Sequence, residues 1–463
     1  MTDAAVTDAP RPPRGRRPRS RFRVALAAIA TFAVVARLGF VAFVDPDVPE
    51  IGDASAYRLL AANLADGDGY IRPFDDLLLG VRRPTAEYPP LFPALLAIPS
   101  ALGAESERAH RVFLTFVGGG TVALVGLLGR RVGGPRVGLV AALLGACYPM
   151  LFLAEATGMA ESLYAPLVVG VLLAAYRAVE RPSVGSFALV GGAAGTATLT
   201  RAEGLLLGAA VAVACCGFAL GRIPARRRAA LGATAIGVMA LVVAPWTVRN
   251  VARLDAFVPV SSNLATLLDG ANCDATYSGR QIGQWRETFS HFGEAARTMP
   301  QALACFEGFA IEDPAFEEAS VASRHRRDGL DYARSHLARQ PKVMAVRVAR
   351  TFGVYAPRQQ VDFESLEGRP RSWQMAGTVA YWVLAPLAAA GLVVLRRRGV
   401  AISPLLAPVA AVVLVSAATY GQQRFRVAAE PVVLVAAAVT LVAAWDASRR
   451  RVDEGPGSAG AGR

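Results

Sequence analysis

The chain has 463 residues, of which 54% are hydrophobic and only 18% are charged, and its mean hydropathy is +0.38. Soluble domains carry about 25% charged residues and disordered chains are poor in apolar ones, so the composition excludes both classes. The net charge of +13 lies largely in arginine runs at alternate ends of apolar blocks, which argues against nucleic acid as a partner.

The apolar blocks are roughly 17–23 residues long, which is the length that crosses a bilayer as a helix. The sequence therefore predicts an all-α polytopic membrane protein with about ten transmembrane helices. In chain order the predicted spans are 24–44, 112–129, 137–153, 162–179, 186–200, 203–220, 230–245, 373–395, 401–418 and 427–445. The fifth and sixth blocks, which flank residues 200–204, could instead form one broken span.

The arginine runs predict the orientation of these helices. If the chain starts in the cytoplasm, ten crossings return the C-terminus there. The runs at 130–131, 226–228, 396–398 and 449–451 then all face the cytoplasm, as short cytoplasmic loops prefer. We therefore expect a multi-pass plasma-membrane protein with both termini in the cytoplasm.

The chain divides into five predicted regions. They are a basic disordered cytoplasmic tail (1–23), helices one to seven with a first outer loop at 45–111 (24–245), a second extracytoplasmic segment (246–372), helices eight to ten (373–445) and a cytoplasmic tail (446–463). The first outer loop contains a helical stretch at 54–65 and an apolar stretch at 88–101. The latter, like the basic stretch at 341–355, is too short to span and predicts an interfacial helix. Gly191 and Gly195, one helical turn apart, predict close helix packing.

Two of the five cysteines, Cys273 and Cys305, fall in the second outer segment. That side of the membrane is oxidising, so we predict a disulfide between them; the alternative is two free thiols. The four histidines show no ligand spacing with one another or with cysteine, so neither a metal site nor another cofactor is predicted.

Ionisable residues are costly at a membrane boundary, so their positions are informative. Those that stand out lie at the predicted outer ends of helices: Asp53, Glu155, Glu161, Arg201, Glu203, Arg424 and Arg426. Arg37, within the first span, is expected to snorkel or to be paired. A carboxylate beside arginine suits a reaction in which the acid accepts a proton from a hydroxyl while the guanidinium stabilises a departing phosphate.

Each of these residues also has a structural interpretation. Asp53 could cap a helix, and Glu161 could be a charge favoured by a helix N-terminus. Arg201 and Glu203 could form a structural ion pair. Arg424 and Arg426 could hold lipid headgroups without specificity.

Six short motifs in order along the chain resemble the GT-C superfamily of integral-membrane glycosyltransferases. The likeness is greatest to the bacterial branch related to protein O-mannosyltransferases and the aminoarabinose transferases of lipid A, a family 39-like group. The motifs are Gly52-Asp53 with Tyr57 and Gly67-Asp68-Gly69-Tyr70, Glu87-Tyr88-Pro89-Pro90-Leu91-Phe92-Pro93, Met159-Ala160-Glu161-Ser162-Leu163-Tyr164, Thr200-Arg201-Ala202-Glu203-Gly204, Pro245-Trp246-Thr247-Val248-Arg249-Asn250, and Arg424-Phe425-Arg426 with Glu430-Pro431.

The resemblance implies roles for several residues. Asp53 matches the acidic residue proposed as the family's general base, and Glu161 matches a second acidic position. Ala54 stands where some members have a second acid beside the first, so the chain departs here from the pattern of a two-carboxylate or metal-assisted version, and the sequence leaves the metal requirement open. Tyr57 and Glu203 fall in matching substrate-binding motifs.

The sequence thus predicts a glycosyltransferase that moves a sugar from a polyprenyl-phosphate donor to an envelope glycan, lipid or protein at the outer face, with inversion. Arg201, Arg424 and Arg426 would bind the donor phosphate, and membrane lipid would surround the donor's tail. The alternative is a polytopic transporter or lipid flippase, and a third possibility is a non-catalytic scaffold.

Overall fold

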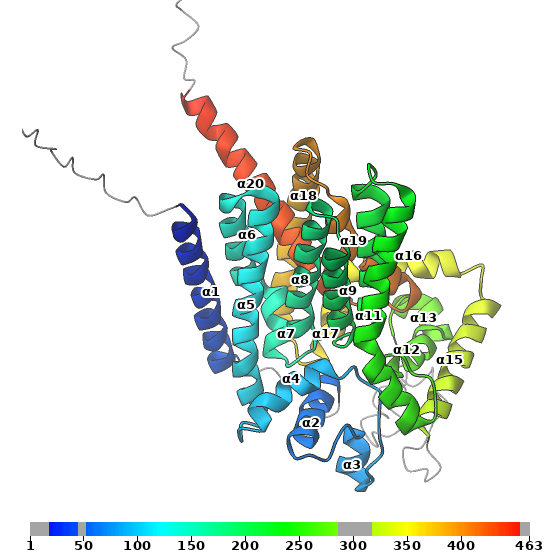
Figure 1. Cartoon of the computed structure of the whole chain (residues 1–463). Coiled ribbons are helices and arrows are strands. Elements are labelled where there is room, and N and C mark those ends of the chain that lie inside the picture. Colours follow the sequence, from blue (N-terminus) through cyan, green and yellow to red (C-terminus); the bar gives the residue numbers. More distant parts are fainter. Residues whose placement is uncertain (1–17, 45–51, 286–316, 454–463) are drawn as a thin grey trace, which may run out of the picture.

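The computed structural model describes residues 18–44, 52–285 and 317–453 of the chain. Within these ranges the ordered elements are helices, with no β-strand among them. Figure 1 shows long helices packed side by side in a bundle, with shorter helices gathered at one end. The all-α polytopic fold predicted from the sequence is confirmed.

Six of the described helices are long and apolar enough to cross a membrane. They are α1 (Pro18–Phe43), α5 (Glu107–Gly133), α8 (Glu161–Glu180), α11 (Ala225–Leu254), α18 (Arg371–Arg397) and α20 (Glu430–Asp453). A seventh candidate is the pair α6 (Pro135–Cys147) and α7 (Pro149–Ala156), bent by 49°. Shorter apolar helices complete the bundle: α9 (Val184–Thr198), α10 (Gly204–Val213) continued by the π-helical η1 (Ala214–Ala219), and α19 (Ser403–Ala418). Each of the ten predicted blocks therefore coincides with an apolar helix or helix pair.

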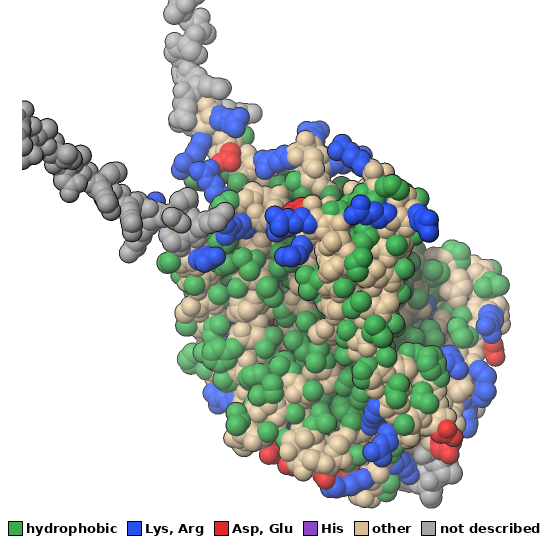
Figure 2. Space-filling view, in the orientation of Figure 1, with side chains coloured by type: hydrophobic (Ala, Val, Ile, Leu, Met, Phe, Trp, Pro, Cys, Tyr) green, Lys and Arg blue, Asp and Glu red, His purple; other side chains and the backbone are tan. Residues whose placement is uncertain are grey.

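The arginine runs mark one end of this bundle, which we call the arginine end. Arg130 and Arg131 lie in the last turn of α5, and Arg396 and Arg397 lie in the last turn of α18. Figure 2 shows Lys and Arg side chains along one rim, a belt of apolar side chains below it, and mixed charges at the opposite end. The runs share one end, as the sequence predicts.

The opposite end, which we call the site end, carries shorter helices, most of them polar. The segment between α1 and α5 forms α2 (Asp53–Ala65), α3 (Pro73–Leu79) and α4 (Leu91–Ser100). The segment between α11 and α18 forms α12 (Asn263–Ala271), α13 (Asp274–Tyr277), η2 (Gly279–Gln281), α15 (Glu318–Ser335), α16 (Gln340–Thr351) and α17 (Pro357–Ser365), and the turn η3 (Gln423–Ala428) precedes α20. The helical stretches predicted at 54–65, 88–101 and 341–355 correspond to α2, α4 and α16.

Helix ends differ from the predicted regions at both termini. The expected N-terminal tail ends at residue 23, but α1 begins at Pro18; residues 1–17 lie outside the described part. The expected C-terminal tail begins at residue 446, but α20 continues to Asp453. Helices continue past the apolar block because a polar helical turn outside the bilayer keeps its backbone hydrogen bonds. The division into five regions stays a prediction.

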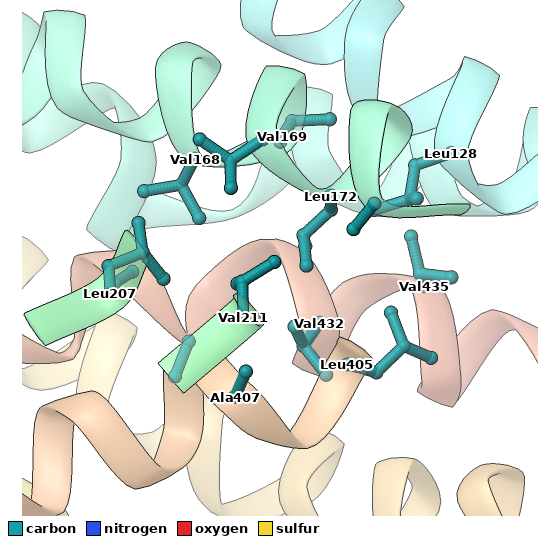
Figure 3. Packing of buried hydrophobic residues seen from close by; sticks show 14 of the residues in the cluster. Leu128, Val168, Val169, Leu172, Leu207, Val211, Leu405, Ala407, Val432 and Val435 are labelled. Carbon is teal, nitrogen blue, oxygen red and sulfur yellow. The ribbon is translucent and has the colours of Figure 1, made fainter. Parts of the chain in front are cut away.

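The interior of the bundle lies between α5, α8, α10, α19 and α20, where Figure 3 shows apolar side chains from these helices meeting. Leu128, Leu172, Val211, Leu405 and Val435 are all fully buried there. Since lipid tails are as apolar as these side chains, close packing rather than removal from water holds such helices together.

Two glycines of α9 bring α11 close. A Cβ added at Gly191 would lie 2.2 Å from the carbonyl oxygen of Ala235, and one at Gly195 would lie 2.7 Å from Cβ of Val242. The predicted role of these glycines in helix packing is confirmed. Gly204 also approaches Thr198 closely, because α10 folds back beside α9 as a separate helix instead of continuing it as a broken span.

The sequence groups Glu155 with the acids at the outer helix ends, and the structure corrects this: Glu155 lies within α7 and not among the acids of the site end. The helix resumes after the bend at Tyr148, and α7 runs to Ala156, so Glu155 is a helical residue buried in the bundle. Its Oε2 accepts a hydrogen bond from Nε of Arg37 at 2.8 Å. Arg37 is therefore paired, which is one of its two predicted states, and Glu155 is separate from the acids at the site end.

Candidate active site

Four regions of the chain, far apart in sequence, place ionisable side chains together at the site end. Asp53 is the first residue of α2, Glu161 is the first residue of α8, Arg201 lies in the turn between α9 and α10, and Arg424 lies in η3. An acid in the first turn of a helix is favoured by the helix dipole, which suits both carboxylates to these positions. We call these residues, with Glu203 and Glu367, the charged cluster.

Both oxygens of the Asp53 carboxylate accept hydrogen bonds. Nη1 of Arg424 donates to Oδ2 at 2.8 Å, and the hydroxyl of Tyr88 donates to Oδ1 at 3.0 Å. Burial alone would raise the pKa of Asp53, but the charge and hydrogen bond of Arg424, with the Tyr88 bond, outweigh it and hold the pKa below its usual value. Asp53 is therefore ionised at neutral pH and retains a side chain that is 27% exposed.

Arg424 is the centre of the cluster. Besides Asp53, its Nη1 lies 3.4 Å from Oε1 of Glu367, and its Nε lies 3.9 Å from Oε1 of Glu161. Its Nε also donates to Oε1 of Gln422 at 2.7 Å, and its Nη2 donates to the hydroxyl of Tyr420 at 3.3 Å. These neighbours fix the plane of the guanidinium, although only 9% of its side chain is exposed.

Arg201 forms a second guanidinium site beside the first. Its Nη1 donates to Oε1 of Glu161 at 2.5 Å, and its Nε donates to Glu203. The Arg201–Glu203 pair considered in the sequence analysis is therefore present, but it is extended by Glu161, which is 1% exposed and links Arg201 to Arg424. Oε2 of Glu161 is buried and has no hydrogen-bond partner within the described ranges.

Tyr57 lies against the cluster through its ring. The ring packs edge-on against Tyr88 at 4.9 Å and against Phe92 at 5.0 Å between centroids. Burial, followed by the charge of Asp53, raises the pKa of the Tyr57 phenol well above its usual value, so the hydroxyl stays protonated. These contacts hold Tyr88 in position to donate to Asp53.

The structure does not bring Arg426 into the cluster. Its side chain is fully buried, its Nε donates to Oε1 of Glu430 at 2.5 Å, and its guanidinium lies 3.6 Å from the centroid of the Tyr381 ring. The hydroxyl of Tyr148 donates to the other oxygen of Glu430 at 2.7 Å. Arg426 therefore belongs to a separate buried pair beneath the cluster.

One member of the cluster, Glu367, carries no predicted role, and neither do its neighbours Tyr88, Tyr420 and Gln422. Tyr88 precedes Pro89 and Pro90 within a recognised motif, and this position could have marked it. Glu367 lies in a polar segment without periodicity, so no signal in the sequence singles it out. Burial, opposed in part by Arg424, raises the pKa of Glu367 to about 7.

Of the two cysteines in the predicted disulfide, one lies within the described residues. Cys273, the residue before α13, is disulfide-bonded, whereas Cys305 lies outside the described residues. The pairing stays a prediction. Within the ranges that the structure describes, no group of three or more His, Cys, Asp or Glu side chains is arranged to hold a metal ion.

Comparison with known proteins shows what the chain resembles. Residues 87–248 match the family model described as dolichyl-phosphate-mannose-protein mannosyltransferase. No curated protein matches the chain. Among solved structures, the Archaeoglobus fulgidus oligosaccharyltransferase in complex with Zn and sulfate aligns with a TM-score of 0.53 at 17% identity, over 93% of this chain and 50% of that one.

Two further structures align with the chain. The A. fulgidus oligosaccharyltransferase AglB, in complex with an inhibitory peptide and a dolichol-phosphate, gives a TM-score of 0.52 at 15% identity, over 95% of this chain and 52% of that one. ArnT from Cupriavidus metallidurans bound to undecaprenyl phosphate gives 0.40 at 16% identity, over 95% and 82%. The chain spans about half the length of the oligosaccharyltransferase. The chain therefore shares its fold with the oligosaccharyltransferase, and residues 87–248 match the mannosyltransferase family model.

Proposed function

We propose that this protein is a membrane glycosyltransferase that moves a sugar from a polyprenyl-phosphate donor to an acceptor hydroxyl. The observation that carries the proposal is the charged cluster, in which an ionised, partly exposed Asp53 lies in contact with one guanidinium and close to a second. A family model for mannosyl transfer from a lipid phosphate matches residues 87–248, and the fold is shared with an enzyme of glycan transfer.

Asp53 is the group that would accept the proton of the acceptor. The acceptor's O–H bond breaks, its proton moves to the free lone pair of an Asp53 oxygen, and the acceptor oxygen forms a bond to the anomeric carbon. The bond from that carbon to the phosphate breaks on the opposite side, and its electron pair leaves with the phosphate, which gives inversion. A positioned base of this kind contributes about 10²–10⁴-fold in rate.

Arg201 and Arg424 would hold the phosphate as it leaves. A guanidinium presents two parallel donors to a phosphate, and this bidentate contact strengthens as charge develops on the leaving group. Glu161 and Glu203 fix the orientation of Arg201, and Tyr57 supports Tyr88 beside Asp53. Arg426, buried against Glu430, would act on the donor only through the position of η3.

The arginine end of the bundle would face the cytoplasm, in keeping with the positive-inside rule. The cluster then opens to the outer face of the plasma membrane, and both termini lie in the cytoplasm. The sequence contains no Walker-type Gly-Lys motif for nucleotide binding. The proposed donor therefore already carries its leaving group, the lipid phosphate, and such a donor suits that face. The acceptor would be a glycan, lipid or protein of the envelope.

The test is sugar transfer in membranes supplied with a labelled polyprenyl-phosphate sugar. We expect Asp53→Asn, which preserves the shape of the side chain, to reduce transfer about 10²–10⁴-fold. Asp66→Asn, an exposed position just after the same helix, is the matched control and should transfer at the unaltered rate. Equal transfer by Asp53→Asn and the unaltered protein would refute the assignment of the base, and movement of intact donor across the membrane without transfer would favour the transporter.

A further inference from the structure

The charged cluster contains more acids than bases. Its four carboxylates face two guanidiniums, and with the neighbouring Arg369–Glu364 pair the count is five carboxylates and three guanidiniums: Asp53, Glu161, Glu203, Glu364 and Glu367 with Arg201, Arg369 and Arg424. If every group is ionised, the site is acidic overall. The lipid phosphate of the proposed reaction is itself an anion. To bind Arg424 it must overcome the repulsion of the carboxylates that already contact this guanidinium.

Among these carboxylates, Glu367 is held least firmly. Asp53 has two hydrogen bonds from side chains, Glu161 and Glu203 each bind Arg201, and Glu364 accepts from the backbone N–H of Gln423 at 2.6 Å. The nearest guanidinium nitrogen to Glu367 is Nη1 of Arg424 at 3.4 Å, a nitrogen already committed to Asp53 at 2.8 Å.

The remaining contacts of Glu367 leave one oxygen free to carry a proton. Oε1 accepts a hydrogen bond from Nε2 of Gln422 at 2.7 Å. Oε2 is buried and has no hydrogen-bond partner in the part of the chain that the structure describes. A buried carboxylate oxygen without a donor is stabilised when it is protonated, because the neutral acid loses less hydration than the anion.

We propose that binding of the lipid phosphate at Arg424 is coupled to protonation of Glu367. With Glu367 neutral, the second negative charge facing Nη1 of Arg424 is removed and this nitrogen is available to the phosphate, while Asp53 remains ionised as the base. The proton comes from bulk water, with which the 25% exposed Glu367 side chain is in contact, and returns there when the phosphate leaves. The inference rests on the proposed function and adds a pH dependence to its donor site.

The groups that face Glu367 act in opposite directions. Burial, the charge of Glu364 on α17 and the charge of Asp53 on α2 raise its pKa, whereas Arg424 in η3 and Arg369 lower it. Together they place the pKa of Glu367 at about 7 in the unliganded site. A phosphate bound to Arg424 weakens the largest favourable contact of the ionised form and adds a negative charge, so protonation becomes easier on binding.

The experiment measures binding of a polyprenyl methyl phosphate to the purified full chain in detergent. This diester resembles the linkage of the donor and carries a single negative charge throughout the pH range used. We expect the dissociation constant to rise above pH 7, by up to about tenfold for each pH unit, as a one-proton linkage requires. Calorimetry in two buffers of different ionisation enthalpy should show proton uptake on binding at pH 7.5.

Two variants separate the role of this carboxylate from a general effect of charge. Glu367→Gln keeps the hydrogen bond with Gln422 and mimics the neutral acid, so it should bind the diester at pH 8 as tightly as at pH 6. Asp362→Asn, at an exposed residue of the same segment paired with Arg371, should keep the pH dependence of the unaltered chain.

The outcomes distinguish this inference from the function on which it rests. Absence of diester binding by the unaltered chain at every pH overturns both proposals. Binding without pH dependence or proton uptake overturns the coupling alone. If Glu367→Gln fails to fold, proton uptake by the unaltered chain still decides the question, and an unchanged pH dependence in a folded Glu367→Gln variant overturns the assignment to Glu367.

Discussion

Replacement of Arg424 by methionine is the most informative perturbation of the charged cluster. Nη1 of Arg424 lies 2.8 Å from Oδ2 of Asp53, which places the two charge centres roughly 4 Å apart. At that separation the interaction is about 4 kcal/mol for an effective dielectric constant near 20. An interaction of that size is enough to move an ionisation, so the pKa of Asp53 should rise in Arg424→Met, where burial is no longer offset by the guanidinium.

The sign of this shift decides the expected pH profile. In the unaltered protein Arg424 holds the pKa of Asp53 below its usual value, so the base stays ionised well into the acid range. Without Arg424, burial of Asp53 is less compensated, and the base becomes protonated at a higher pH. The acid limb of kcat/KM, which reports groups of the free enzyme, should therefore move toward neutral pH.

A second effect of the same change is independent of pH. Loss of a charge-assisted hydrogen bond to the phosphate costs about 1.5–3 kcal/mol, or roughly 10–150-fold in transfer on the alkaline side of the limb. Arg424→Lys is the matched control, because it keeps the positive charge without the planar pair of donors. It should lose rate but retain the acid limb of the unaltered protein.

The assay is transfer from a labelled polyprenyl-phosphate sugar by the reconstituted protein between pH 4.5 and 8.5. An Arg424→Met variant whose acid limb coincides with that of the unaltered protein would refute the reasoning, because Arg424 would then not set the ionisation of the base. If the acid limb of Arg424→Lys moves as far as that of Arg424→Met, the change in the pKa of Asp53 is due to geometry and not to charge.

Two further predictions concern the bundle that supports the site. Glu155→Gln leaves the Arg37 guanidinium without its buried counter-ion, and breaking such a pair costs about 3–5 kcal/mol. The melting temperature in detergent should therefore fall. The double variant Arg37→Met/Glu155→Gln should recover most of that fall in melting temperature. Gly191→Ala should destabilise the contact of α9 with α11, because its Cβ would lie 2.2 Å from the Ala235 oxygen, whereas Gly192→Ala on the same helix has open space and should melt like the unaltered protein. Equal melting temperatures for the two glycine variants, or a double variant no more stable than Glu155→Gln, would contradict these predictions.

The sequence predicts the transmembrane architecture well, because an apolar block long enough to span a bilayer is a local property of the chain. The ten predicted blocks and the three short helices at 54–65, 88–101 and 341–355 all have helical counterparts. Contacts between distant residues are less predictable. Arg37 and Glu155 are 118 residues apart, and nothing in either local sequence indicates that the bend before α7 turns this acid toward α1.

Only part of the charged cluster is predictable from the sequence, because contacts between distant residues leave no local signal. Asp53, Glu161, Arg201 and Arg424 each stand at a helix start or in a short turn, where motif position is informative. Glu367 has no such marker, because the segment around it lacks both periodicity and a recognised motif. Its place beside Arg424 depends on how α17 folds back onto the loop at Gln422, which is a tertiary contact.

Arg424 and Arg426 are separated by a simple geometric effect. The two residues lie in η3, a 3₁₀ turn with about three residues per turn, so side chains two positions apart point in widely different directions. Arg424 reaches Asp53, whereas Arg426 reaches Glu430 and stacks on Tyr381. We interpret the Arg426–Glu430 pair as the anchor that fixes η3 to α20 and thereby positions Arg424.

The two carboxylates that share Nη1 of Arg424 have opposite requirements in the proposed mechanism. Asp53 must be ionised to accept a proton, and its pKa lies below the usual value, whereas Glu367 must be neutral for the phosphate to bind, and its pKa is about 7. Pairs of acids whose environments separate their pKa values in this way commonly divide the roles of an active site. Because Arg424 lowers the pKa of both acids, transfer should be confined to a pH window between the two values, and loss of its charge in Arg424→Met should move both limits of that window to higher pH.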